Sequence, residues 1–369
     1  MTKKRIAFIG IKGLPSRAGA DRVVEAIASR VDPGKYEPYV YCSASVVPAE
    51  AQLPGIHLLR IRALTGKHLH ATSLFLFAAL HALIFGRYDL VHLHNVEASF
   101  VLPILRLRYK VISTSHGPAQ KREKWSGPAR KLIRWMEVPY IRMSNTVTSV
   151  SQPLAREYER QYKRAVHFVP NGVPKAEDID LVAARTLLDE IGVMPHNYVL
   201  FAAGRIMASK GCHLFLEAAH NIDADVQYVV VGDASHVPAY DEQLHALADE
   251  RVHFVSFISE KATLMGLLKL SRALVFPSTV EAMSMMLLEA ASLETPVVCS
   301  DIPENVSVLP EQAVHFKSGN ATDLAARLRW ALDHPAEMEK LARQASEWVN
   351  HHYDWDAIVH QYELLYSDI

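Results

Sequence analysis

Two carboxylates stand eight residues apart in a segment that is otherwise small or apolar, Ser278-Thr-Val-Glu-Ala-Met-Ser-Met-Met-Leu-Leu-Glu-Ala-Ala-Ser292. On one continuous helix, Glu281 and Glu289 would point about 80° apart, which suits a shared site poorly. Ser284 is a good N-cap residue, and good helix formers begin at Met285. The segment therefore predicts a helix that begins near Ser284, with Glu281 in the loop before it and Glu289 inside it.

The start of this helix is a candidate anion site, because the first N–H groups of a helix have no partner within the helix. The backbone at Ser284 and Met285 would face the anion, and carboxylates on either side would accept hydrogen bonds from hydroxyls. A nucleotide sugar has this layout, with a sugar, a diphosphate and a ribose. The alternative is that Glu289 is a capping or surface residue and Glu281 a loop charge.

Two further segments could bind phosphate. Gly10-Ile-Lys-Gly-Leu-Pro-Ser-Arg-Ala-Gly19 follows a predicted strand, and its glycines Gly13 and Gly19 would let the backbone approach a ligand closely. Its spacing differs from the dinucleotide fingerprint, which disfavours an NAD enzyme and leaves a structural turn as the alternative. Arg205 and Lys210 lie between a predicted strand and a helical run, where a guanidinium fork and a mobile ammonium could hold a diphosphate.

Other motifs suggest metal binding less strongly. His92 and His94 would share one face of a strand, which permits metal binding but is more typical of a core or site-lining pair. Three Asp-x-Asp pairs fall in a joint, in a turn and near the C-terminus, at Asp178–Asp180, Asp223–Asp225 and Asp354–Asp356. We therefore predict no metal site and no cofactor.

A basic segment, Lys121 to Trp135, holds six Lys or Arg and two Trp in fifteen residues. Basic residues interleaved with tryptophan suit an anionic membrane surface or a lipid-linked diphosphate acceptor, and Lys121, Arg122 and Lys124 are candidates for that contact. The alternative is a solvated helix with buried tryptophans. No segment is typical of a nucleic-acid-binding module.

Composition predicts a two-domain globular protein. The chain has 369 residues, of which 50% are hydrophobic and 21% charged. Its three cysteines, Cys42, Cys212 and Cys299, are widely spaced and form neither a disulfide framework nor a zinc pattern, so we expect a cytoplasmic protein. The apolar run Leu74 to Phe85 is too short to span a membrane and predicts a core helix, with insertion into a membrane interface as the alternative.

Charge is distributed unevenly along the chain. Residues 1–175 contain 27 Lys and Arg against 11 Asp and Glu, while the remainder contains 12 against 29. A basic half joined to an acidic half indicates that one half faces an anionic partner.

Short apolar runs alternate with helix-length segments throughout the chain, starting with Ile6–Ile9 and again near Tyr198. This pattern predicts two doubly wound α/β domains that face each other, each with a parallel sheet and a ligand at the carboxyl ends of its strands. The turn-rich stretch from Val169 to Asp180 would join them. We expect a first domain of residues 1–175 completed by a C-terminal helix at about 352–369, and a second domain of residues 176–351.

Several of these motifs together make the sequence resemble the retaining glycosyltransferases of family four, which have the GT-B fold. The resemblance runs over nearly the whole chain. The motifs that carry it are highly specific together, although most are weak singly: Gly19-Ala-Asp-Arg22, His92-Leu-His-Asn95, Ser115-His-Gly117, Val169-Pro-Asn-Gly-Val173, Gly204-Arg205 with Lys210-Gly211, and Glu281 to Glu289. The C-terminal segment Ile358 to Leu365 is similar to the family's last helix, which crosses back to the first domain.

The resemblance implies a role for each matching residue. Glu281 would hold the hydroxyls of the donor sugar, Glu289 would hold the ribose, and His116 would lie beside the transferred sugar. Arg205 and Lys210 would neutralise the departing diphosphate. His94 and Asn95 would lie on the acceptor side.

The chain departs from the family in three places, since Ala282 and Ser284 replace frequent glycines and Asp21 replaces a frequent glutamate. These changes leave the identity of the donor open.

The sequence thus predicts a metal-independent retaining transfer of a hexose or deoxyhexose from a nucleotide sugar to a glycan or lipid-linked glycan, in cell-surface polysaccharide synthesis. The protein would be cytoplasmic, with a possible peripheral association with the inner face of an anionic membrane, and would not bind nucleic acid. The alternatives are a GT-B epimerase or hydrolase of the nucleotide sugar, and a noncatalytic subunit that binds it.

Overall fold

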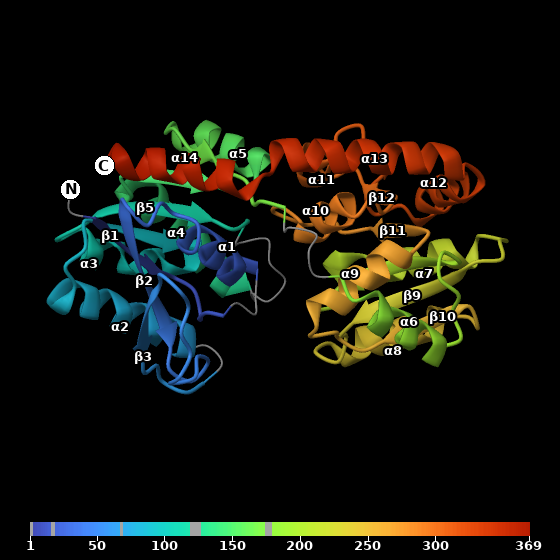
Figure 1. The fold of residues 1–369 in the computed structure, drawn as a ribbon, viewed down its shortest axis with the longest axis horizontal. Coiled ribbons are helices and arrows are strands. Elements are labelled where there is room, and N and C mark those ends of the chain that lie inside the picture. The colour runs from blue at the N-terminus through green and yellow to red at the C-terminus, as the bar shows by residue number, and fades with distance from the viewer. Residues whose placement is uncertain (1–2, 16–18, 67–68, 119–126, 174–178) are drawn as a thin grey trace. The chain divides into compact units, whose positions relative to one another are not determined.

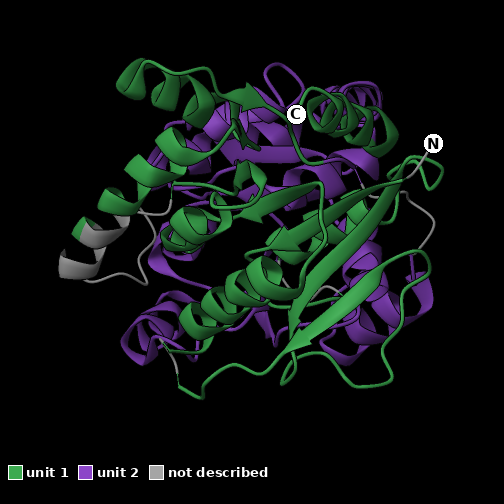
Figure 2. Cartoon of the chain, turned by 90° about the vertical axis from the view of Figure 1, so that its left-hand side faces the viewer, with its two compact units in different colours: residues 1–171, 355–369 green, residues 172–354 purple. Residues whose placement is uncertain are grey.

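The computed structural model describes residues 3–15, 19–66, 69–118, 127–173 and 179–369. The chain divides into two compact units, coloured separately in Figure 2. Unit 1 contains residues 1–171 and 355–369, and unit 2 contains residues 172–354. The C-terminal helix therefore belongs to the same unit as the N-terminal half of the chain.

Unit 1 is built on a sheet of seven parallel strands in the order β3-β2-β1-β4-β5-β6-β7. The strands are β1 (Lys4–Ile9), β2 (Tyr36–Ser43), β3 (His57–Ile61), β4 (Leu90–His94), β5 (Lys110–Ser115), β6 (Thr146–Ser149) and β7 (His167–Phe168). The helical segments that cover them are α1 (Gly19–Ala28), α2 (Leu69–Phe85), η1 (Val96–Val101), α3 (Leu102–Leu105), α4 (Gly127–Met143), α5 (Gln152–Tyr162) and α14 (Trp355–Ser367).

Both faces of the central strands of this sheet are buried, as the continuous apolar runs predicted. Along β1, Ile6 and Phe8 pack in one hydrophobic cluster with residues of α1 and α14, whereas Ala7 and Ile9 pack in another with residues of α2 and α3. The predicted return of the C-terminal helix to the first half of the chain is confirmed. It begins at Trp355 and buries Tyr362 and Tyr366 completely against the sheet.

Unit 2 repeats this plan with six parallel strands in the order β10-β9-β8-β11-β12-β13. The strands are β8 (Tyr198–Ala203), β9 (Gln227–Gly232), β10 (Val252–Val255), β11 (Ala273–Phe276), β12 (Val297–Ser300) and β13 (Val314–Phe316). The helical segments are α6 (Leu181–Glu190), η3 (Ala208–Lys210), α7 (Cys212–His220), α8 (Pro238–Leu247), α9 (Lys261–Leu270), α10 (Met285–Ser292), α11 (Pro303–Val308), α12 (Ala321–Asp333) and α13 (Pro335–His352).

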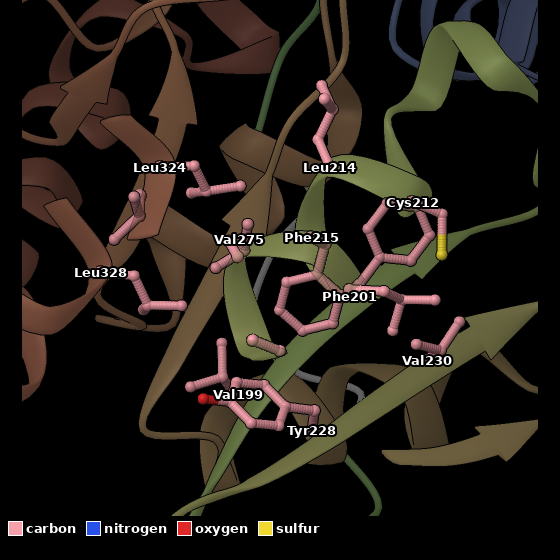
Figure 3. Close-up of a cluster of buried hydrophobic side chains, with 14 of the residues drawn as sticks. Val199, Phe201, Cys212, Leu214, Phe215, Tyr228, Val230, Val275, Leu324 and Leu328 are labelled. Carbon is pink, nitrogen blue, oxygen red and sulfur yellow. The ribbon is translucent and has the colours of Figure 1, made fainter. Parts of the chain in front are cut away.

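One hydrophobic cluster of unit 2 lies between this sheet and the helices α7 and α12. Figure 3 shows Phe201 of β8 and Phe215 of α7 side by side, with Leu328 of α12 in the same cluster. The two phenylalanine rings are stacked with their centroids 5.9 Å apart. This packing fixes β8 and α7, and therefore the loop between them that carries Arg205 and Lys210.

The apolar run Leu74 to Phe85 forms the greater part of α2, but the prediction of a core helix is only half right. One side of α2 packs on the sheet through residues such as Leu74 and Ala78. On its other side Ile84 is 62% exposed, and at its end Phe85 is 71% exposed. Within the described residues, no helix combines the length and the hydropathy that crossing a membrane requires.

Candidate active site

The sheets of the two units each contain a point at which the chain reverses its direction of winding. In unit 1 the chain runs outward from β1 to β3 and returns to β4, which pairs with β1. In unit 2 the corresponding neighbours are β8 and β11. Such a switch point leaves a crevice at the carboxyl ends of the two strands, where ligands of doubly wound proteins bind. The predicted site residues follow these strands and their neighbours in both units.

The glycine-rich loop of unit 1 is held against the end of β4. Gly10 has a φ of +105°, and a Cβ at this position would lie 2.0 Å from the carbonyl oxygen of His94. The side-chain amide of Asn95 donates a hydrogen bond of 2.9 Å to the carbonyl of Gly10. The close approach requires glycine and brings the loop beside the predicted acceptor-side residues.

The described part of this loop is held at Lys12 by a carboxylate, Asp21, at which the sequence departs from the family. Asp21 lies buried in α1 and accepts a hydrogen bond from the backbone N–H of Lys12. Burial raises the pKa of Asp21, and the backbone N–H groups of Lys12 and Gly13 oppose that rise. A Cβ on Gly13 would lie 2.4 Å from Val47, so the loop is tightly packed there, whereas a Cβ on Gly19 at the start of α1 would meet no heavy atom within 4 Å.

Three imidazoles form a column beneath the carboxyl edge of unit 1. His94 Nδ1 lies 2.9 Å from His116 Nε2, and the rings of His92 and His94 are 4.1 Å apart at their centroids. His92 bridges Tyr366 of α14 and Thr114 of β5, at 2.8 and 2.6 Å. The column thus connects the C-terminal helix to His116, which follows β5 and is half-buried.

This column is electrically neutral in its interior. Burial lowers the pKa of His92 to about 3, and burial together with the neighbouring imidazoles lowers the pKa of His94 well below its usual range. An imidazole without charge offers one donor and one acceptor nitrogen. His116 therefore receives a neutral, oriented hydrogen-bond partner from His94.

In unit 2 the loops after β8 and β11 are joined, and this brings two predicted residues into contact. The backbone N–H of Thr279 donates to the carbonyl of Ser209 at 2.8 Å. Gly211, with a φ of +71°, passes so close to Pro277 that a Cβ would lie 2.2 Å from its carbonyl oxygen. As a result the ammonium of Lys210 donates to the carboxylate of Glu281 at 2.6 Å.

The predicted helix start at Ser284 is confirmed. Ser284 is the N-cap of α10, and its hydroxyl accepts a hydrogen bond of 3.4 Å from the backbone N–H of Leu287. Glu281 lies in the preceding loop, and Glu289 is buried one turn inside the helix. The N–H groups at the start of α10 therefore lie between the two carboxylates in sequence, as predicted.

Glu289 has a cationic neighbour that the sequence analysis missed. Lys261, the first residue of α9, places its ammonium 3.1 Å from the carboxylate of Glu289, whose side chain is 3% exposed. A buried carboxylate requires such a partner, because transfer of an isolated charge from water is costly. A buried Glu in an apolar helix is the signal that could have prompted a search for this lysine.

Arg205, the second residue predicted to bind the diphosphate with Lys210, lies in the same loop region. Arg205 directly follows β8 and Gly204, and its side chain is exposed. The next residue anchors the loop, because the N–H of Ile206 donates to the carbonyl of Asp233 at 2.9 Å. An exposed guanidinium on an anchored backbone is accessible to a ligand phosphate.

One group of predicted residues has no structural account. Lys121, Arg122 and Lys124 lie outside the described residues. In the part of the basic segment that is described, Trp135 of α4 is 81% exposed, so the alternative of a buried tryptophan is wrong at this position.

The described residues contain no group of three or more His, Cys, Asp or Glu side chains arranged to hold a metal ion. Asp180, from one of the Asp-x-Asp pairs, caps α6 and accepts from the N–H of Ala183 at 2.9 Å. This aspartate has a structural role at a helix N-terminus.

Two family models match the chain, one in each half. The family described as Glycosyltransferase Family 4 matches residues 17–177, and the family described as Glycosyl transferases group 1 matches residues 187–348. The two matches together cover most of the sequence.

Similar proteins include enzymes that act on sugars. The alpha-maltose-1-phosphate synthase of Mycobacterium tuberculosis is 28% identical over 305 residues, 76% of this chain and 79% of that protein. The UDP-Gal:alpha-D-GlcNAc-diphosphoundecaprenol alpha-1,3-galactosyltransferase of Escherichia coli is 25% identical and covers 59% of each chain.

The sucrose-phosphate synthase of Thermosynechococcus elongatus has a similar solved structure, with a TM-score of 0.83 over 99% of both chains at 21% identity. This likeness and the two parallel-sheet units establish the fold as GT-B. The chain is a group 1 glycosyltransferase and belongs to glycosyltransferase family 4.

Proposed function

We propose that this glycosyltransferase moves a hexose or deoxyhexose from its nucleotide-sugar donor to a glycan or lipid-linked glycan, with retention of the anomeric configuration. The observation that supports this proposal most is the arrangement in unit 2 of Lys210, Glu281 and Glu289 around the start of α10. The cluster has cations for a diphosphate and carboxylates for hydroxyls, as a nucleotide sugar requires.

Lys210 has two possible partners in this proposal, and the exchange between them is part of the mechanism. In the structure its ammonium is paired with the carboxylate of Glu281. With donor, we propose that Lys210 and Arg205 bind the diphosphate, which gains negative charge as the glycosidic bond breaks, and that Glu281 accepts hydrogen bonds from the sugar hydroxyls. Positive charge placed where negative charge develops stabilises the transition state, and here it would do so without a metal.

The roles proposed for the remaining residues follow their environments. Glu289, buried beside Lys261, would accept hydrogen bonds from the ribose, and the N–H groups after Ser284 would contact the diphosphate. Gly13 and Gly19 would let the loop of unit 1 approach the donor, and His116 would donate to or accept from the transferred sugar. His94 and Asn95 would shape the acceptor side.

The acceptor proposal is supported by charge and by one relative. Within the basic half of the chain, the first half of α4 carries the exposed residues Lys131, Arg134 and Trp135. The name of the galactosyltransferase from Escherichia coli specifies a diphosphoundecaprenol-linked acceptor. We propose an acceptor of this lipid-linked class, a role in cell-surface polysaccharide synthesis, and a cytoplasmic protein that associates peripherally with the inner face of an anionic membrane.

A panel of nucleotide sugars tests the proposal. The donor is identified as the compound that raises the melting temperature most, since a ligand that binds only the folded state stabilises it. With that donor, sugar transfer should require an acceptor, should produce the same anomeric configuration as the donor by NMR, and should persist in excess chelator.

Other outcomes would identify other functions. Epimerised or hydrolysed donor in the absence of acceptor, at the rate seen with acceptor, would indicate an epimerase or a hydrolase. Tight donor binding without any turnover over a broad acceptor panel would indicate a noncatalytic subunit. Loss of transfer in chelator with recovery on addition of a divalent cation would contradict the metal-independent mechanism.

A further inference from the structure

The helix α2 carries an apolar surface on the side that faces away from the sheet. Leu69, Leu76, Leu80 and Ile84 are spaced by seven, four and four residues and therefore share one side of the helix. Leu69 is 59% exposed, Leu80 is 37% exposed, Ile84 is 62% exposed and Leu76 is half-buried. We refer to these four residues as the α2 face. Its leucines and isoleucine extend over nearly the whole length of the helix.

A further exposed apolar residue lies near the C-terminal end of the α2 face. Leu107, in the turn after α3, is 76% exposed. This turn is fastened to the last turn of α2, because Arg108 donates to the carbonyl of Leu83 at 2.8 Å and Tyr109 donates to the carbonyl of Ala82 at 2.7 Å. Figure 1 shows α2 and α3 next to each other in unit 1.

The surroundings of the α2 face are basic. Arg87 lies two residues after the end of α2, and Arg106 and Arg108 flank Leu107; all three side chains are exposed. We refer to these three arginines as the basic corner. The sequence has no Asp or Glu between Glu50 and Asp89, and none between Glu97 and Glu123. Asp89, the acid nearest to Arg87 in sequence, accepts a hydrogen bond of 2.7 Å from the backbone N–H of Arg5.

We propose that α2 lies in the plane of an anionic membrane interface, with the α2 face in contact with lipid and the basic corner bound to phosphate headgroups. The exposed side of α2 is apolar, and the basic corner lies beside its C-terminal end, a combination that suits the headgroup boundary of an anionic bilayer. Anionic headgroups attract each nearby Lys or Arg, so basic residues strengthen binding to such a surface. A protein partner of ordinary composition would not require a surface from which acids are missing over two long segments.

This inference deepens the proposed peripheral membrane association and assigns it to a surface distinct from the basic segment that ends at Trp135. The strands β4 and β5 begin just after the basic corner, so the corner lies at the amino edge of the sheet, whereas Leu69 lies at the other end of α2. If α2 lies parallel to the membrane plane, the carboxyl edge of the unit 1 sheet, with His116 and Asn95, is next to the bilayer.

Flotation with vesicles of phosphatidylcholine, with and without phosphatidylglycerol, tests the inference on the full chain. We expect binding that requires phosphatidylglycerol and weakens with added salt. The variant Leu80→Gln/Ile84→Gln should reduce the partition coefficient by about ten- to a hundredfold, because two aliphatic side chains no longer enter the interface. Arg87→Ser/Arg106→Ser should reduce binding to anionic vesicles less strongly.

Two matched controls separate this surface from others. Val182→Gln removes an apolar side chain that is 76% exposed on α6 of unit 2 and should leave binding unchanged. Lys131→Ser/Arg134→Ser removes basic residues of α4 and should have a smaller effect than the change in the α2 face. Equal melting temperatures of all variants would show that each is folded.

A fluorescent label provides a direct readout of insertion. The three native cysteines are buried, so a cysteine introduced at the surface can be labelled selectively. An environment-sensitive fluorophore on Ile84→Cys should shift its emission to the blue on addition of anionic vesicles, whereas the same label on Val182→Cys should not.

Other outcomes overturn the inference. One is that the protein does not bind vesicles, and another is that Leu80→Gln/Ile84→Gln binds them as well as the wild type does. A third is self-association of the protein without lipid that this variant abolishes. That result would identify a second copy of the chain as the occupant of the α2 face. Sugar transfer from the identified donor to a lipid-linked diphosphate acceptor is measured on the same samples. Absence of transfer with intact binding through α2 would refute the proposed reaction and leave this inference in place.

Discussion

The two units share one architecture but carry different chemistry at the carboxyl edges of their sheets. Unit 1 places buried imidazoles there, joined to one another and to hydroxyls by hydrogen bonds, and its His92 and His94 are neutral. Unit 2 places lysines and glutamates there, in ion pairs of 2.6 and 3.1 Å. The parallel sheet thus determines where a ligand can bind, and the residues that follow each strand determine what kind of ligand that is.

The charge of the site residues in each unit does not follow the net charge of the corresponding half of the chain. The N-terminal half is strongly basic, yet the interior of its site is uncharged, and the acidic half holds the cations proposed to bind the diphosphate. The excess of positive charge in unit 1 is therefore located on surfaces such as the basic corner. Net charge and site chemistry are separate features and require separate tests.

The largest expected effect concerns the cations of unit 2. Lys210→Ala and Arg205→Ala should each lower turnover by about 10²- to 10³-fold, because each removes positive charge from the departing diphosphate. Steady-state kinetics with the identified donor measure this effect. Lys340→Ala, which changes an exposed lysine on α13 of the same unit, serves as the control and should retain wild-type turnover. Loss of affinity at unchanged turnover in both site variants would argue for a binding role alone.

The next effect concerns the neutral imidazoles of unit 1. The pKa of His92 is about 3 in the folded chain and about 6.5 when unfolded, so below pH 6.5 the unfolded chain binds a proton that the folded chain does not. The contribution of neutral His92 to the free energy of unfolding is therefore fully present above pH 6.5. It decreases as the pH falls toward 3, by at most about 1.4 kcal/mol per pH unit.

Denaturant unfolding at pH 7 and pH 5 measures this dependence. Between pH 7 and pH 5 the free energy of unfolding should decrease in both proteins. The decrease should be about 2 kcal/mol smaller for His92→Gln than for the wild type. His167→Gln, which changes an exposed histidine of β7, should behave as the wild type does. Identical pH dependence in His92→Gln and the wild type would mean that His92 is not the buried neutral group described.

A smaller effect is expected from the lysine beside Glu289. Lys261→Met leaves a buried carboxylate without its cation and should lower the free energy of unfolding by about 1–2 kcal/mol, since Lys261 is itself partly in water. Adding Glu289→Gln should restore most of that loss, because the uncompensated charge is removed. Thermal unfolding of the two single variants and the double variant measures this coupling. Simple addition of the two single effects would show that the pair is not coupled.

The sequence was informative where local patterns decide the structure. Ser284 before a run of helix formers was sufficient to predict the start of α10, and uninterrupted apolar runs were sufficient to predict strands such as β1 and β8. Both signals arise from neighbours along the chain, through capping and through burial of both faces of a parallel sheet.

Other features depend on contacts between distant segments and could not be predicted in this way. The partners of Glu289 and His92 are Lys261 and Tyr366, which are brought close by the packing of α9 and α14. The apolar composition of α2 predicted a helix, but it could not reveal that one side remains uncovered, because a hydrophobic residue contributes equally to an interior and to an exposed apolar face.

The central claim is that unit 2 holds the two ends of a nucleotide sugar through two different carboxylates. Calorimetry with the nucleoside diphosphate of the identified donor tests it most directly. We predict that Glu289→Gln weakens binding of this compound, whereas Glu281→Gln does not weaken it and yet loses most of the transfer activity, because Glu281 contacts the absent sugar and its removal releases Lys210 for the diphosphate. The reverse order, with Glu281→Gln weakening the nucleoside diphosphate more than Glu289→Gln does, would contradict the account.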